Sequence, residues 1–249
     1  MANGIVIWEG ASAIDGAPIM VVATGIKTSS RNAKTGNLIQ TWILRSDVKP
    51  TDATHTGADR SICGDCPHRG EIVDGKNVNR SCYVTVFQAP LNIYNTTHRG
   101  KYERVSLDVA RQHFAGRSVR LGAYGDPAAV PFEVWETVLK DAARGTGYTH
   151  QWKTCSPDFA RYCMASADSP CEAIAAQAMG YRTFRVGTPA EKLARGEFLC
   201  PASKEAGQKV NCAACLACGG TSSPNRSSVF IPAHGAKNKV TAFERRANV

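Results

Sequence analysis

Three cysteines in the first third of the chain have the residue type and spacing of a metal-binding loop. Cys63 and Cys66 form a C-x2-C pair, and Cys82 follows after a polar stretch. A C-x2-C pair is the shortest loop that lets two thiolates point at one metal. Three thiolates can hold zinc if a fourth ligand joins them, or an iron–sulfur cluster with one open iron. His68 is the candidate fourth ligand for zinc, although a loop histidine taken alone is more often solvated.

A second group of cysteines lies near the C-terminus: Cys200, Cys212, Cys215 and Cys218. The spacing C-x11-C-x2-C-x2-C, followed by two glycines, is a strong metal signal. It resembles ferredoxin-type spacing more than a zinc ribbon, in which two C-x2-C pairs lie well apart. A [4Fe–4S] cluster and Zn2+ are both compatible with four thiolates, and a zinc ion that only pins the C-terminal loop is the structural alternative. We expect the remaining cysteines to be buried, inert thiols: Cys155, Cys163 and Cys171.

Charge and composition indicate which partners and which cellular location to expect for the protein. The chain has 249 residues, ordinary hydrophobic and charged fractions and a net charge of +9. A basic protein favours a nucleic acid or another polyanion as its partner, but basic surfaces without that role are also common. Nothing resembles a signal peptide, and no apolar run approaches the length of a membrane span. We therefore expect a cytoplasmic protein without a membrane partner, in which reduced thiols bind metal rather than form disulfides. The sequence indicates no oligomeric state.

Strands, a long loop and helices are expected before residue 118. Short apolar runs between turn residues predict a small antiparallel β unit within residues 1–46. Residues 45–80 read as a long polar loop that carries the first two cysteines, and such a loop in a compact domain is usually functional. Residues 83–94 are apolar enough for a helix that Pro90 limits. Ser106 is positioned to cap a helix over residues 107–115.

Residues 118–200 alternate between predicted strands and helices. The strands are expected at 118–124, 147–152, 164–168 and 181–186. Capping boxes at residues 169–172 and 188–191 begin helices that Gly180 and Gly196 end. This alternation is typical of βαβ units with a parallel sheet.

The predicted fold is α/β: a partial (β/α) barrel with a small N-terminal antiparallel β unit and a C-terminal Cys-rich metal-binding loop. We expect one domain over residues 1–249. Its parts are the β unit (1–46), the Cys loop and barrel core (47–199) and the four-cysteine segment (200–249).

These features together resemble radical SAM enzymes, over about residues 37–231. The resemblance rests on the partial barrel, three cysteines after an early strand and extra cysteines near the C-terminus. The usual motif of that family is C-x3-C-x2-C with an aromatic residue before the last cysteine, whereas here the spacing is C-x2-C-x15-C and Tyr83 follows Cys82. Gly125-Asp126-Pro127 is similar to a Gly-Glu-Pro turn that some of these enzymes place near the cofactor. The whole chain also resembles small proteins encoded by bacteriophages and prophages, which implies no activity.

The resemblance implies a reaction site at the carboxyl ends of the strands. A [4Fe–4S] cluster on the first three cysteines would leave one iron free to bind S-adenosylmethionine. The implied catalytic residues are Asp126, His150, Ser166 and Asp168. The implied cofactor-binding residues are Tyr83, Tyr124, Gly125, Trp152 and Arg185. Three of these residues also have a simpler role open to them: His150 as a satisfied core histidine, Asp126 as a turn residue, and Asp168 as the lead into a helix.

The expected function is a radical SAM-like iron–sulfur enzyme that modifies a nucleotide or a nucleic-acid base. The alternative is a zinc protein that binds nucleic acid without catalysis, and a third possibility is a structural metalloprotein. Strand–helix alternation and polar strand ends favour the enzyme, because zinc-type nucleic-acid binders are mostly small and modular. The net charge of +9 fits the binder.

Overall fold

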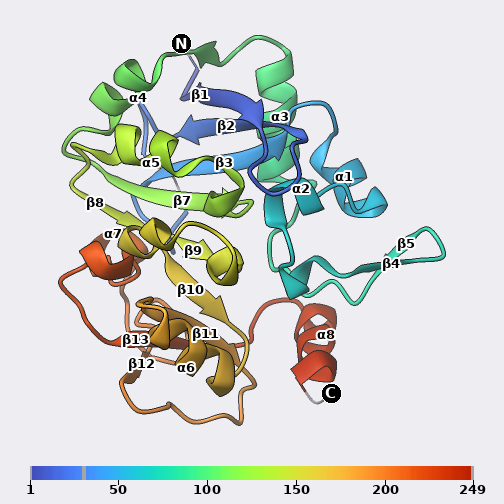
Figure 1. Cartoon of the computed structure of the whole chain (residues 1–249), viewed down its shortest axis with the longest axis vertical. Helices are drawn as coiled ribbons and strands as arrows, with labels where there is room; N and C mark the ends of the chain where they lie inside the picture. The colour runs from blue at the N-terminus through green and yellow to red at the C-terminus, as the bar shows by residue number, and fades with distance from the viewer. Residues whose placement is uncertain (1, 30–31, 248–249) are drawn as a thin grey trace.

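The computed structural model of the chain describes residues 2–29 and 32–247 (Figure 1). It is an α/β protein with mixed and parallel sheets, and its described residues contain eight α-helices. The strands are β1 (Gly4–Ala11), β2 (Pro18–Thr24), β3 (Ile39–Arg45), β4 (Glu71–Val73), β5 (Lys76–Val78), β6 (Glu103–Arg104), β7 (Ser118–Tyr124), β8 (Arg144–Thr146), β9 (Tyr148–Thr149), β10 (Met164–Ala167), β11 (Thr183–Gly187), β12 (Glu197–Leu199) and β13 (Ser228–Pro232). The α-helices are α1 (Pro50–Thr56), α2 (Arg60–Cys63), α3 (Ala89–His98), α4 (Leu107–Phe114), α5 (Phe132–Leu139), α6 (Pro170–Ala178), α7 (Cys212–Cys215) and α8 (Lys237–Ala247). The 3-10 helices are η1 (Pro67–Arg69), η2 (Pro127–Ala129), η3 (Gln151–Lys153), η4 (Pro157–Arg161) and η5 (Gly220–Ser222).

The predicted N-terminal antiparallel unit is confirmed. Strands β1, β2 and β3 pair antiparallel in sequence order. The residues of β2 from Ile19 to Ala23 are all buried, as expected of a central strand covered on both faces. This unit is the middle of a six-stranded sheet with the order β6-β1-β2-β3-β7-β8.

The predicted parallel strands are also present, divided between two sheets. Strand β7 pairs parallel with β3 and β8, and the second sheet has the order β12-β13-β11-β10-β9 with every pair parallel. Only Gly147 separates β8 from β9, so one short stretch of chain belongs to both sheets (Figure 1). A Cβ at Gly147 would lie 2.8 Å from the sulfur of Cys163, which explains the glycine at this junction. The described strands do not close into a barrel.

The helix starts predicted from capping residues are confirmed at Ser106 and Ser169 but not at Thr188. Ser106 caps α4 by accepting from the Val109 amide, and Ser169 caps α6 by accepting from the Glu172 amide. The helix expected after Thr188 is wrong: residues 188–196 are turns and irregular chain. The Glu191 carboxylate accepts from the Thr188 amide as in a capping box, but Arg185 holds that carboxylate and the Lys192 carbonyl, and no helix follows. No helix in the described ranges is long and apolar enough to cross a bilayer.

Two other expectations about local structure are corrected. Residues 45–80 are not a structureless loop, because they contain α1, α2, η1 and the β4–β5 hairpin, which projects from the body of the protein in Figure 1. Residues 83–88 are not helical either. Helix α3 begins at Ala89, and Pro90 lies in its first turn, where its missing N–H group costs nothing.

Candidate functional site

The C-x2-C loop is held between a helix end and a buried glutamine. Helix α2 ends at Cys63, and the Cys66 amide donates to the Cys63 carbonyl at 3.2 Å. The Gln151 amide nitrogen donates to the Cys63 carbonyl at 3.1 Å, and its oxygen accepts from the Asp65 amide. Gly64 lies against Gln151 with φ +54°, where a side chain would collide with that amide group. The loop is therefore fixed to η3, immediately after β9.

A buried carboxylate ties the rest of this segment together. The Asp59 side chain is fully buried and accepts from Arg69 at 2.8 Å and from Arg80 at 3.3 Å. Arg69 also donates to the carbonyls of Gly57 and Gly64. Asp59 therefore joins the residues just before the C-x2-C pair to those just before Cys82.

A backbone hydrogen bond ties the third cysteine to the segment that follows the first two. The Cys82 amide donates to the His68 carbonyl at 2.9 Å. Burial, then the Asp59 carboxylate and the thiolates of Cys66 and Cys82, raise the pKa of the Cys63 thiol. Burial raises the pKa of Cys82 as well, although the Arg80 charge opposes it. The Cys63 thiol thus lies close enough to Cys66 and Cys82 for their charges to raise its pKa.

Polar groups from the carboxyl ends of β7, β9 and β10 meet this loop. The Tyr124 hydroxyl, at the end of β7, is buried without a hydrogen-bond partner, and its pKa is raised by burial and by the nearby Cys63 thiolate. The Asp126 amide donates to the Ile62 carbonyl at 2.6 Å. Its carboxylate accepts from the backbone amides of Ala128 and His150 at 3.0 and 2.8 Å. Asp126 therefore fixes the position of His150 relative to α2.

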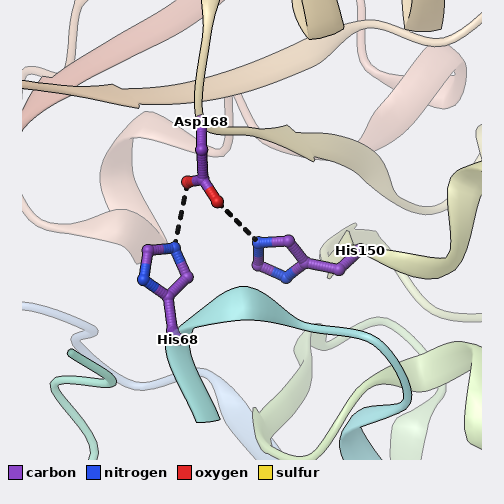
Figure 2. A group of neighbouring side chains, drawn as sticks. All are labelled: His68, His150 and Asp168. Carbon is purple, nitrogen blue, oxygen red and sulfur yellow. Dashed lines mark hydrogen bonds and ion pairs between the residues drawn. The ribbon is translucent and has the colours of Figure 1, made fainter. Parts of the chain in front are cut away.

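Two histidines and an aspartate converge beside the cysteines (Figure 2). His68 Nε2 lies 3.0 Å from one oxygen of Asp168, and His150 Nε2 lies 3.8 Å from the other. These ligand atoms all lie within 4.8 Å of one another, and no other group of three or more His, Cys, Asp or Glu residues in the described part of the chain does so. Burial opposes protonation of His150, but the Cys66 thiolate and the Asp168 carboxylate raise its pKa well above the ordinary value.

The C-terminal helix covers the outer side of His68. The Phe243 ring stacks on the His68 ring, with centroids 5.8 Å apart and an angle of 12°. Arg246 Nη2 lies 3.0 Å from His68 Nδ1, and Arg246 Nη1 donates to the Ser81 hydroxyl and the Pro67 carbonyl. Both ring nitrogens of His68 therefore face partners other than the thiols of the first cysteine group. His68 is not placed as the fourth ligand of a zinc ion on those thiols.

The C-terminal cysteines surround a small cavity of their own. Its lining contains all four thiols together with Tyr148 and apolar side chains. Helix α7 is capped by Asn211, and Leu216 after it adopts φ +49°, which turns the chain between the third and fourth cysteines. Burial raises the pKa of Cys218 to about 12, and a hydrogen bond from Tyr148 opposes that rise. Four soft donors around an apolar cavity form a suitable donor set for a metal centre.

Other residues named from the sequence have structural partners. Trp152 is buried and donates to the carbonyl of Ser166, itself a buried residue, at 3.0 Å. Arg185, 1% exposed, is bound to Glu197 and Glu191. A Cβ at Gly125 would lie 2.7 Å from Ile43, so this glycine permits the close packing of the turn on β3.

The remaining cysteine predictions have mixed outcomes. Cys163 is buried as expected, but Cys171, at the start of α6, is exposed, and Cys155 is partly buried. The buried-thiol prediction is therefore wrong for Cys171. Tyr83 is 62% exposed, and its hydroxyl accepts from Arg120 at 2.8 Å.

Comparisons with protein-family models, with curated proteins and with solved structures find no match for this chain. The resemblance to radical SAM enzymes therefore rests on the residues and motifs of the chain itself.

Sequence reasoning missed the residues that complete the site from a distance. Arg246 and Phe243 lie more than 170 positions after His68, and no spacing or motif links them to it. Asp59 and Arg80 carried no signal beyond their charge. Gln151 was expected in a strand, whereas it begins η3 and faces the C-x2-C loop.

Proposed function

We propose that the protein is an iron–sulfur enzyme of the radical SAM type that acts on a nucleotide or a nucleic-acid base. One observation carries this proposal: the loop with Cys63, Cys66 and Cys82 packs against the carboxyl ends of β7 and β9, beside Tyr124 and His150. Enzymes built on parallel strands bind their substrates at that end.

The parallel strands form the proposed scaffold. Strands β7 and β8 are parallel neighbours in one sheet, β9, β10, β11 and β13 are parallel neighbours in the other, and Gly147 joins β8 to β9 along the chain. We interpret this series as a partial (β/α) barrel that is open on one side. Such a scaffold gives several strand ends on which polar residues can surround a substrate.

The donor sets suit clusters better than single zinc ions. Sulfurs that bind one zinc ion at about 2.3 Å lie roughly 4 Å apart, whereas those of a cubane cluster bind separate iron atoms. In the described part of the chain, no three thiols of either cysteine group lie within 4.8 Å of one another. The C-terminal quartet lines a cavity, and the first group includes the unpartnered Tyr124 hydroxyl among its neighbours.

When bound, a cluster on three thiolates would supply an electron and an iron with a free coordination position. The chain's own residues have distinct tasks around it. Arg80 places a positive charge beside Cys82 and Cys63, which offsets the charge of the thiolates. Asp126 holds the His150 backbone through a hydrogen bond. While they bind no metal ion, His150 with its partner Asp168 is the pair in position to accept or deliver a proton at this end of the sheet.

The net charge of +9 is the observation that favours a second candidate, a zinc protein that binds nucleic acid without catalysis. It also fits an enzyme whose substrate carries phosphate groups. The contacts of His68 with Asp168, Ser81 and Arg246 weigh against the zinc site expected for that candidate.

Metal analysis of anaerobically purified and reconstituted protein tests the proposal. We expect about eight iron atoms per chain, as two [4Fe–4S] clusters. Cys82→Ala and Cys215→Ala should each lower the iron content by about half, and Cys171→Ala, an exposed thiol outside both groups, should leave it unchanged. Stoichiometric zinc without iron would contradict the proposal and support the second candidate.

A further inference from the structure

We propose that His68, His150 and Asp168 form a binding site for one divalent transition-metal ion beside the first cysteine group, with no cysteine among its ligands, and that Arg246 competes with this ion. The inference concerns residues that the proposed clusters do not use. It stands whether or not the cysteines bind iron.

Two buried polar atoms that face each other are the first argument. His150 Nε2 and Asp168 Oδ2 form a long ion pair of 3.8 Å (Figure 2), and each atom is buried without a hydrogen bond. Buried polar atoms are almost always hydrogen-bonded, because leaving one without such a partner costs stability. A divalent ion between the two atoms, in place of the proton on His150, would coordinate both.

The ligand set is the second argument. Three segments contribute two imidazole nitrogens and one carboxylate. His68 lies in η1, His150 directly follows β9, and Asp168 directly follows β10. Their ligand atoms lie within 4.8 Å of one another. Two histidines and one carboxylate are a common ligand set for divalent transition metals, and they leave coordination positions open for water or a substrate.

The third argument is the proton on His68. A guanidinium group has no acceptor, so Arg246 Nη2 must donate to His68 Nδ1 across the 3.0 Å contact. His68 Nδ1 is then without a proton, and Nε2 carries the proton that it donates to Asp168 Oδ1. In this tautomer Nε2 cannot bind a metal ion.

Metal binding therefore requires the opposite tautomer. With the ion on Nε2, the proton must lie on Nδ1, and the Ser81 hydroxyl, 2.8 Å away, can accept it. Metal-bound histidines usually donate their second N–H to such a partner. Arg246 cannot keep its contact with Nδ1 in that state. Phe243 still stacks on the ring from the same helix, so only the guanidinium group has to withdraw.

A titration with Mn2+ followed by the loss of its free-ion electron paramagnetic resonance signal tests the site. Manganese prefers nitrogen and oxygen ligands, so the cysteine groups contribute little to this signal. We expect about one tightly bound Mn2+ per chain in the unsubstituted protein, since the site has a single set of three ligands. Asp168→Asn and His150→Gln should lose stoichiometric binding while they keep the far-ultraviolet circular dichroism of the folded chain.

The role of Arg246 is tested in the same titration. Arg246→Gln should bind Mn2+ about tenfold more tightly, the size of effect usual for a group that controls a metal ligand. Arg245→Gln, an exposed neighbour with the same charge, should change the affinity little. Equal binding by the unsubstituted protein and Asp168→Asn would overturn the site, as would binding that depends on Cys66 instead. An unchanged affinity in Arg246→Gln would overturn the competition.

Discussion

Asp59 is a buried acidic residue that joins the segments on either side of the first cysteine group. It accepts from two arginines, and its own side chain has no exposed surface. Removing the charge from one member of a buried ion pair leaves the other members uncompensated. Arg69 and Arg80 would then lose the group that holds them beside Cys63 and Cys82.

We therefore predict that Asp59→Asn lowers the free energy of unfolding by about 3 kcal/mol. The variant should also retain less iron after reconstitution, because the loop no longer holds its thiols together. Chemical denaturation and iron analysis check the two effects. Asp65→Asn is the matched control, since the Asp65 side chain is 81% exposed in its contact with Arg60. A variant with unchanged stability and iron content would show that Asp59 does not organise the loop.

At the scale of elements, an ion pair joins β11 to β12. The side chains of Arg185 and Glu197 are each 1% exposed and lie 2.8 Å apart. Burial alone would raise the pKa of Glu197, but hydrogen bonds from Arg185 and the Ala194 amide lower it. A carboxylate with a lowered pKa stabilises the fold above its ordinary value of about 4.3, and that contribution is lost as the pH falls through the pKa of the folded state.

We predict that Arg185→Met destabilises the protein by about 3–5 kcal/mol at neutral pH, because Glu197 is left buried without a partner. The pKa of Glu197 in the variant should then lie above the ordinary value, so the sign of its contribution reverses. The variant should lose less stability than the unsubstituted protein when the pH falls from 6 to 4. Urea denaturation at both values measures this. A parallel loss of stability in the two proteins would contradict the role given to the pair.

Arg185 also shows where prediction of the fold from the sequence stopped. Local signals predicted α4, α6 and β10 well, since caps and apolar runs act over a few residues. The segment after Thr188 carries a capping-box pattern, and the Glu191 carboxylate does accept from the Thr188 amide. Arg185 from β11 also binds that carboxylate and the Lys192 carbonyl, and no helix forms. A contact from strand β11 therefore accompanies the loss of a local preference.

The candidate site was likewise predictable only where its signals are local in the sequence. Cysteine spacing identified both metal-binding candidates, and strand ends identified His150 and Asp168 as neighbours. The position of His68 between Asp168 and Arg246 depends on the packing of α8 from the far end of the chain. No periodicity or motif contains that information.

At the scale of the whole molecule, the two cysteine groups are linked through Arg120 on β7. Its guanidinium group donates to the hydroxyl of Tyr83, the residue after Cys82. Its charge also lowers the pKa of Cys212 in the C-terminal group, against the larger effect of burial. A single side chain on the six-stranded mixed sheet therefore contacts a neighbour of the first group and places its charge near the second. We interpret the molecule as one scaffold for the two proposed metal centres rather than as two independent modules.

The most direct test of that account is the cleavage of S-adenosylmethionine by the anaerobically reconstituted and dithionite-reduced protein. We predict slow formation of 5′-deoxyadenosine, measured by chromatography. Cys82→Ala should abolish it while the C-terminal cluster remains, and Cys171→Ala should retain it. If reduced protein with both clusters in place forms no 5′-deoxyadenosine and its electron paramagnetic resonance signal does not respond to S-adenosylmethionine, the proposed enzyme class is wrong.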